Sequence, residues 1–264
     1  MEALDALVLG IIQGIAEWLP ISSSGHLVIA QELMGMPAGE NLFFDLVVHL
    51  GTVLAVCVYF RRQLWSILRA LFSRHPEPGS EGHRMRTLGL MILLGTVPVM
   101  LVGVTLASVV EDIFSLGMVG IALLVNGAVL LVAERACSAG SRSGVRTTDA
   151  LVVGAMQAIS IIPGVSRSGL TLSGGMFRGL EKEAAATFAF LLSVPALLGA
   201  FVYGAASLER YDAELTTLLI GSVSAFLVGL VSIDYLLKAV RASKLWVFSI
   251  YCFAVGTIVL LLSL

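Results

Sequence analysis

Two short polar stretches interrupt otherwise apolar sequence and carry the residue types that phosphoryl transfer requires. The first is WLPISSSGH at residues 18–26, and the second is IIPGVSRSG at residues 161–169. Hydroxyl, carboxylate and imidazole groups attack phosphorus or move protons, and a guanidinium neutralises the charge on a transferring phosphoryl group. Such groups cost on the order of several kcal/mol in hydrocarbon without partners, so we expect them to be functional.

Four residues in or beside these stretches are the candidate catalytic set: Glu17, Ser23, His26 and Arg167. Glu17 and Gln13 are four residues apart and would share one face of a helix. The planar fork of Arg167 suits bidentate contact with phosphate. We favour Ser23 as the nucleophile, with His26 activating it and Glu17 orienting His26 or holding a metal. Attack by His26 itself and direct attack by water remain open.

The same stretches predict an oxyanion site at two helix N-termini. Each polar break is followed by the restart of a helix, so free N–H groups and positive dipole ends would point into one centre. The candidate phosphate-binding residues are Gln13, Ser22, Ser24, Gly25, Ser166, Ser168 and Thr171. Asp45 and His49, one helical turn apart, are weaker candidates for lining the cavity.

Composition places these residues in a membrane protein. The chain has 264 residues, of which 58% are hydrophobic and only 13% charged, with a mean hydropathy of +0.97. That is far too apolar for a soluble domain of this length. A net charge of -2 gives no indication of nucleic-acid binding. The three cysteines form no C-x-x-C pair, which argues against disulfide and zinc sites.

The hydropathy pattern predicts an all-α integral membrane fold with six transmembrane helices and two re-entrant helix-loop-helix hairpins. The predicted spans are 42–60, 88–109, 116–134, 187–206, 215–237 and 246–264, each close to spanning length. The regions 4–34 and 150–178 are apolar but broken by Pro, Gly and Ser. Non-helical backbone at membrane depth needs a protein or cavity environment, so these regions are predicted to be the hairpins.

Basic residues divide the ends of the spans into two sides. If each hairpin returns to the side that it entered, all but two of the 16 lysines and arginines fall on one side, including six arginines in 61–86. The exceptions are Arg210 on the opposite side and Arg167 inside the second hairpin. Because cytoplasmic loops are enriched in Lys and Arg, we predict a multi-pass protein of the bacterial cytoplasmic (inner) membrane. Both termini would then lie on the outer, periplasmic side.

The two halves of the chain also resemble each other. GIIQGIAEWLPISSSG from Gly10 aligns with GAMQAISIIPGVSRSG from Gly154, and LLGTVPVMLVG from Leu93 aligns with LIGSVSAFLVG from Leu219. We therefore predict one membrane domain, 1–264, made of repeats at about 1–135 and 150–264. Each repeat has one hairpin and three spans, an odd number, so the second repeat would have inverted topology.

The runs at 13–26 (Q-x-x-x-E-x-x-P-x-S-S-x-G-H) and 163–171 (P-G-x-S-R-S-x-x-T) resemble the two signature motifs of bacterial undecaprenyl-diphosphate phosphatases, the bacitracin-resistance family. The resemblance covers essentially the whole chain. It implies hydrolysis of undecaprenyl diphosphate, which recycles the lipid carrier for peptidoglycan synthesis, cell-wall biogenesis and cell shape and confers resistance to bacitracin. Glu17, Ser23, His26 and Arg167 fall on the positions that the family uses for chemistry.

The resemblance also implies a divalent cation, Mg²⁺ or Ca²⁺. The family has Glu or Gln where this chain has Gln13, so Glu17 is the only motif carboxylate. We expect the cation to be held largely by Glu17, substrate oxygens and water. The expected partners are the lipid diphosphate and membrane lipids, and a homodimer is compatible with the sequence.

A second function class shares the same architecture. Inverted repeats with discontinuous helices also build secondary transporters, so an anion carrier or lipid-phosphate flippase is the alternative hypothesis. A purely structural membrane protein is a third. The Ser-His-Glu set beside Arg167 favours an enzyme, because an anion carrier has no obvious use for these three residues.

Overall fold

We describe the fold from a computed structural model of the chain. It describes residues 1–36, 41–73, 76–112, 115–136, 142–207 and 214–263, with 106–112 and 136 as backbone only. Regular structure in these residues is helical, and one isolated bridge pairs Arg142 with Leu180. The helices are α1 (Ala3–Trp18), α2 (Ser23–Leu33), α3 (Leu42–Tyr59), α4 (Arg61–Phe72), α5 (Glu81–Asp112), α6 (Leu116–Ala136), α7 (Thr147–Ile159), α8 (Arg167–Phe177), α9 (Lys182–Ser207), α10 (Leu215–Arg241) and α11 (Leu245–Leu262).

The predicted all-α membrane fold is confirmed. Among the described residues, six helices are long and apolar enough to cross a membrane: α3, α5, α6, α9, α10 and α11. Two of them begin earlier than predicted, α5 at Glu81 instead of 88 and α9 at Lys182 instead of 187. The hydropathy pattern locates only the apolar part of a span, whereas backbone hydrogen bonding continues the helix into polar sequence.

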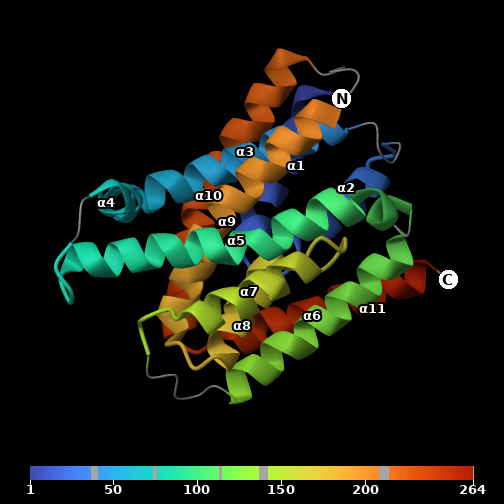
Figure 1. The fold of residues 1–264 in the computed structure, drawn as a ribbon. Coiled ribbons are helices and arrows are strands. Elements are labelled where there is room, and N and C mark those ends of the chain that lie inside the picture. Colours follow the sequence, from blue (N-terminus) through green and yellow to red (C-terminus); the bar gives the residue numbers. More distant parts are fainter. Residues whose placement is uncertain (37–40, 74–75, 113–114, 137–141, 208–213, 264) are drawn as a thin grey trace.

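The basic segment between the first two spans contains α4, a helix that the sequence analysis did not predict. Ile67 and Ala70 are buried on one face of α4, whereas Trp65 and Phe72 are exposed on another. Arginines lower the hydropathy of this segment below that of a span, although its apolar residues have helical spacing. Figure 1 shows α4 nearly end-on where α3 and α5 run across the view, so α4 lies crosswise to both helices.

Both polar breaks occur where the sequence predicted them. α1 ends at Trp18 and α2 begins at Ser23, whereas α7 ends at Ile159 and α8 begins at Arg167. In Figure 1, α7 and α8 lie between α5 on one side and the α6–α11 pair on the other. The re-entrant path of these hairpins through a membrane stays a prediction.

Pairs of glycines allow two equivalent helix contacts. A Cβ added at Gly10 of α1 would lie 2.4 Å from the carbonyl oxygen of Gly221 on α10, and one at Gly154 of α7 would lie 2.3 Å from that of Gly95 on α5. In the alignment of the two halves, Gly10 matches Gly154 and Gly95 matches Gly221. The inverted repeat stays a prediction, and these matched contacts support it.

Replacing Gly154 with Ala is expected to destabilise the protein by about 1–3 kcal/mol, because the added methyl group would force α7 away from the α5 backbone. The measurement is the thermal unfolding midpoint in detergent. Gly199→Ala on α9 is the matched control, since no atom lies within 4 Å of the position of its Cβ. An unchanged midpoint for Gly154→Ala would contradict the close α5–α7 contact.

A buried carboxylate fixes the start of α7. Asp149 has no exposed surface, and its carboxylate accepts hydrogen bonds from Arg142 Nη1 at 2.9 Å and Arg178 Nε at 3.0 Å. Burial alone raises the pKa of Asp149, but hydrogen bonds from Arg142, the Arg146 amide and Arg178, together with the Arg142 charge, lower it below its usual value. This cluster joins α7 to the end of α8.

Because the pKa of Asp149 is lower in the folded protein than in the unfolded chain, its ionised form stabilises the fold above about pH 4, and this contribution is lost as the pH falls further. We therefore expect the thermal midpoint of the wild type to fall more steeply between pH 5 and pH 3 than that of Asp149→Asn. Parallel pH profiles of the two proteins would contradict this role.

Candidate functional site

The helices that follow the two breaks are capped by serines within the motifs. Ser22 Oγ accepts a hydrogen bond from the Gly25 amide at 3.3 Å, and Ser166 Oγ accepts one from the Gly169 amide at 3.1 Å. These are N-cap contacts, which satisfy amides that otherwise lack partners at a helix start. Ser22 and Ser166, predicted to bind phosphate, thus already bind the ends of their own helices.

Hydrogen bonds join the two breaks to each other. The Gly164 amide donates to Ser24 Oγ at 3.4 Å, and Ser168 Oγ donates to the Leu19 carbonyl at 3.0 Å. Asn126 of α6 adds a contact that the sequence analysis missed, because its amide donates to the Pro20 carbonyl at 2.8 Å. The only signal for Asn126 was an amide within an apolar span.

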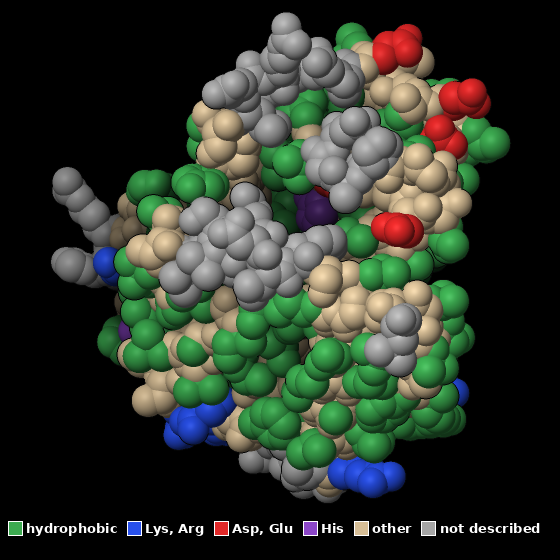
Figure 2. Space-filling view, turned by 90° about the vertical axis from the view of Figure 1, so that its right-hand side faces the viewer, with side chains coloured by type: hydrophobic (Ala, Val, Ile, Leu, Met, Phe, Trp, Pro, Cys, Tyr) green, Lys and Arg blue, Asp and Glu red, His purple; other side chains and the backbone are tan. Residues whose placement is uncertain are grey.

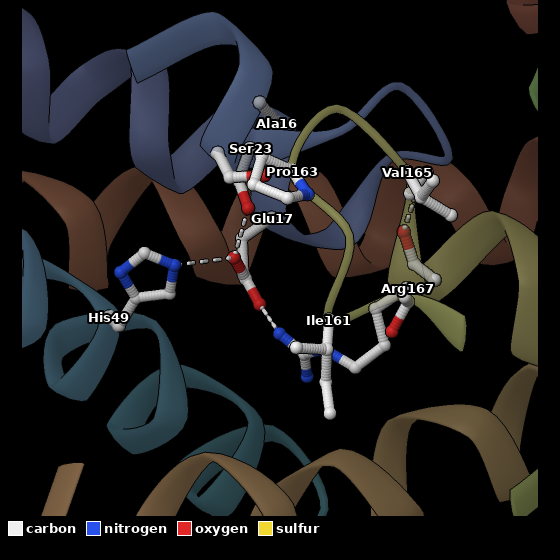
Figure 3. Close-up of a pocket in the computed structure, with 12 residues that line it drawn as sticks. Ala16, Glu17, Ser23, His49, Ile161, Pro163, Val165 and Arg167 are labelled. Carbon is white, nitrogen blue, oxygen red and sulfur yellow. Dashed lines mark hydrogen bonds and ion pairs between the residues drawn. The ribbon is translucent and has the colours of Figure 1, made fainter. Parts of the chain in front are cut away.

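Glu17 lies at the centre of the site (Figure 3). Its Oε2 accepts hydrogen bonds from Ser23 Oγ at 2.5 Å and from Gln13 Nε2 at 2.9 Å. Its Oε1 pairs with Arg167, and Oε2 lies 3.5 Å from His49 Nε2. The carboxylate is fully buried, so these partners replace the water that would otherwise solvate its charge.

Ser23 and Arg167 reach Glu17 from equivalent places. Each is the first helical residue after its break, Ser23 in α2 and Arg167 in α8. The hydroxyl from one hairpin and the guanidinium from the other thus contact the two oxygens of one carboxylate. This arrangement brings together three of the four predicted catalytic residues.

A cavity of about 170 Å³ opens beside Glu17. Its polar lining consists of Glu17, Ser23, Ser24, His49, Ser160, Ser166, Arg167 and Ser168, and Ala16, Ile161, Pro163 and Val165 form its apolar lining. Figure 2 shows a hollow on one face of the molecule, within which a histidine side chain is visible. The cavity is large enough for a phosphate group and its first waters.

His49, a weaker candidate in the sequence, lies in this cavity, and Asp45 supports it from one turn earlier in α3. His49 Nδ1 is 2.6 Å from the Asp45 carbonyl oxygen, and the Asp45 carboxylate accepts a hydrogen bond from Gln31 at 2.8 Å. A carbonyl oxygen only accepts, so Nδ1 carries a proton and Nε2 faces Glu17. Asp45 itself is not among the lining residues.

His26 is placed differently from the prediction. Its Nδ1 is 2.7 Å from the Ser22 carbonyl oxygen, and its Nε2 is 2.7 Å from the hydroxyl of Tyr251 on α11. His26 is not among the residues that line the cavity. Sequence spacing put His26 three residues after Ser23, but the α2 turn directs its ring toward α11 instead of Glu17.

Three other predicted phosphate ligands have structural contacts. Thr171 Oγ1 donates to the Arg167 carbonyl at 2.8 Å within α8. A Cβ at Gly25 would lie 3.0 Å from Val119 of α6, so Gly25 permits close packing. Gln13 is buried beneath Glu17, and its Oε1 has no hydrogen-bond partner among the described residues. The hydroxyls of Ser23, Ser24, Ser160 and Ser168 line the cavity, but those of Ser160 and Ser168 already donate to the carbonyls of Gln157 and Leu19.

The described residues do not form a metal site by themselves. They contain no group of three or more His, Cys, Asp or Glu side chains placed to hold an ion. Glu17 is the only carboxylate in the cavity lining, and both of its oxygens already have partners. Divalent cations prefer six or more oxygen ligands, which this set of side chains does not supply.

Comparison with known proteins supports the same conclusion as the motifs. Residues 6–258 match the family described as bacitracin resistance protein BacA. Two similar relatives, each named undecaprenyl-diphosphatase, come from Korarchaeum cryptofilum (40% identity, 98% of this chain and 99% of the relative) and Carboxydothermus hydrogenoformans (39%, 100% and 98%). A third, from Bacillus thuringiensis and named undecaprenyl-diphosphatase 4, is 34% identical over 100% of this chain and 98% of the relative. The chain belongs to the bacitracin resistance protein BacA family.

Proposed function

We propose that this protein is a membrane phosphatase that hydrolyses undecaprenyl diphosphate to undecaprenyl phosphate and inorganic phosphate. Its full-length relatives bear the name of that activity. The observation that carries the proposal is the contact of one buried carboxylate, Glu17, with both a hydroxyl and a guanidinium beside a cavity. Those are the groups that phosphoryl transfer to a protein hydroxyl requires.

Ser23 is the nucleophile in this proposal. Its Oγ attacks the terminal phosphorus and gives its proton to Glu17 Oε2, which lies 2.5 Å away. The bond between that phosphorus and the bridging oxygen breaks, and undecaprenyl phosphate leaves with the electron pair. Water then attacks the phosphoserine, the P–Oγ bond breaks, and Glu17 returns the proton to Ser23 while phosphate departs.

Arg167 supplies the charge for the transferring phosphoryl group. One of its nitrogens is bound to Glu17, but a guanidinium has five N–H donors, and 18% of this side chain is exposed. The remaining donors are available to the equatorial phosphoryl oxygens, where negative charge is concentrated in the transition state. Backbone amides at the starts of α2 and α8 add to the same field.

If the reaction uses a divalent cation, Mg²⁺ or Ca²⁺, the oxygens of the bound diphosphate would be its main ligands. Glu17 is the one carboxylate in the cavity lining that could contribute, and it would have to share its oxygens with Ser23 and Arg167. The cation would neutralise diphosphate charge. Every residue role given above holds whether or not it is present.

In this proposal the protein spans the bacterial cytoplasmic membrane with both termini outside, and the site accepts its substrate from the outer side. The excess of Lys and Arg on the other side supports this orientation. Recycling of the lipid carrier there serves peptidoglycan synthesis and opposes bacitracin. Association as a homodimer remains compatible with this placement. We do not propose a carrier, because transport has no need of the hydrogen bond between the Ser23 hydroxyl and the Glu17 carboxylate.

The test is phosphate release from undecaprenyl diphosphate by the purified protein in detergent, with rapid quenching of substrate labelled on its terminal phosphate. We expect release with Mg²⁺ or Ca²⁺, and label on the peptide that contains Ser23. Ser23→Ala is the control and should carry no label. Absence of release from the wild type would defeat the proposed activity. Label on His26 would identify His26 as the nucleophile, and label on neither residue would favour water as the nucleophile.

A further inference from the structure

The imidazole of His26 is held at both nitrogens by groups outside the catalytic cavity. Nδ1 lies 2.7 Å from the Ser22 carbonyl oxygen, and Nε2 lies 2.7 Å from the Tyr251 hydroxyl. The two rings also stack, with centroids 5.5 Å apart and planes inclined by 15°. His26 is thus linked to Glu17 through the Ser22 carbonyl, the α2 backbone and the Ser23 hydroxyl.

The donors and acceptors of this contact have one arrangement when the ring is neutral. The Ser22 carbonyl only accepts, so His26 Nδ1 carries the proton and donates. Nε2 then has a lone pair and accepts from the Tyr251 hydroxyl. Tyr251 lies inside α11, a span of mean hydropathy 2.4. A hydroxyl in such a span has little water to bind, which favours its bond to His26.

This contact acts on the residue that precedes the nucleophile. Ser22 has a φ of 72°, in the left-handed region that a serine rarely occupies. Its carbonyl oxygen accepts from both the backbone amide and Nδ1 of His26. Rotation of the Ser22–Ser23 peptide would redirect the Ser23 side chain, whose Oγ now lies 2.5 Å from Glu17.

We propose that Tyr251 is a positioning residue for Ser23. Through its stacked, hydrogen-bonded contact with His26, Tyr251 holds the Ser22 carbonyl and so directs the Ser23 hydroxyl at Glu17. This inference rests on the proposed function and assigns His26 to the same positioning unit, in place of nucleophile or base. The last span of the chain thereby controls the geometry of a site formed by the two breaks.

The first test is Tyr251→Phe, which keeps the ring and its stacking but removes the hydroxyl. We expect kcat for phosphate release to fall about tenfold with KM within about twofold of wild type, because the hydroxyl acts on nucleophile alignment and not on substrate binding. Tyr235→Phe on α10 is the matched control, since Tyr235 packs edge-on against Phe248, and it should leave both constants unchanged. A wild-type kcat for Tyr251→Phe would overturn the inference.

The second test separates positioning from direct chemistry by His26. In His26→Asn the side-chain amide can still donate to the Ser22 carbonyl, so we expect partial activity. Adding Tyr251→Phe to this variant should cause no further loss, because the partner of the hydroxyl is already absent. Additive losses in the double variant, or a His26→Asn protein as inactive as Ser23→Ala, would overturn the inference.

A spectroscopic measurement gives a result that does not depend on activity. In ¹⁵N-histidine-labelled protein, Tyr251→Phe should shift the Nε2 resonance of one histidine with a protonated Nδ1, and His26→Asn should remove that resonance. No shift in Tyr251→Phe would overturn the inference even if the wild type is active. If the wild type releases no phosphate but Tyr251→Phe still shifts this resonance, the proposed function is wrong and the contact between Tyr251 and His26 is established.

Discussion

Glu17→Gln is expected to reduce phosphate release about a thousandfold, with a smaller change in substrate affinity. The amide of Gln has the shape of the carboxylate but cannot accept the hydroxyl proton of Ser23. In the wild type, Ser23 Oγ lies 2.5 Å from Glu17 Oε2. It also leaves Arg167 and His49 without the charge that they face in the buried site. The measurement is single-turnover phosphate release, which separates chemistry from product dissociation.

Glu183→Gln is the matched control for this change. Glu183 is exposed, and its carboxylate lies 2.5 Å from the guanidinium of Arg241. Glu183 does not line the cavity, so its replacement should leave the rate unchanged. The thermal midpoints of both variants should be measured in parallel, because burial of an unpaired Arg167 would also lower stability. A folded Glu17→Gln protein with a near wild-type rate would remove Glu17 from the mechanism.

The sequence predicted the elements of this site well because each break has a local cause. A proline with neighbouring serines and glycine ends one helix and caps the next, and both Ser22 and Ser166 form those caps. The direct pairing of Glu17 with Arg167 was not predicted. The sequence analysis placed both residues at one site, but it gave Glu17 to His26 or a metal and Arg167 to phosphate. The helix breaks that carry these residues are therefore predictable from sequence, whereas the partner of each side chain depends on how the helices pack.

Residues with several available partners were not predictable in the same way. His26 follows the serines closely, yet the direction of its ring depends on where α11 packs, and Tyr251 is 225 residues away in sequence. His49 appeared only as a weaker candidate, because its distance to Glu17 depends on the packing of α3 beside α1. Side-chain direction in these cases is set by tertiary contacts, which local spacing does not encode.

Arg167→Lys is expected to lower kcat/KM for undecaprenyl diphosphate about a hundredfold, although it keeps the positive charge. In the folded protein Arg167 binds Glu17 and lines the cavity at the same time. A planar fork can hold the carboxylate with one nitrogen and present others to phosphate, whereas a single ammonium must divide a compact set of donors between them.

Arg167 both pairs with Glu17 and lines the cavity, so the control must separate these two roles from a general effect of replacing Arg with Lys. Arg241→Lys changes the same residue type in an exposed pair with Glu183 and should keep the wild-type rate, whereas Arg167→Lys should also weaken inhibition by the product phosphate. Loss of both turnover and phosphate inhibition indicates that Arg167 contacts the transferring group directly. Full inhibition by phosphate with slow turnover would instead indicate that Arg167 acts only by holding Glu17. The charge of the phosphoryl group would then have to be stabilised by the helix N-termini.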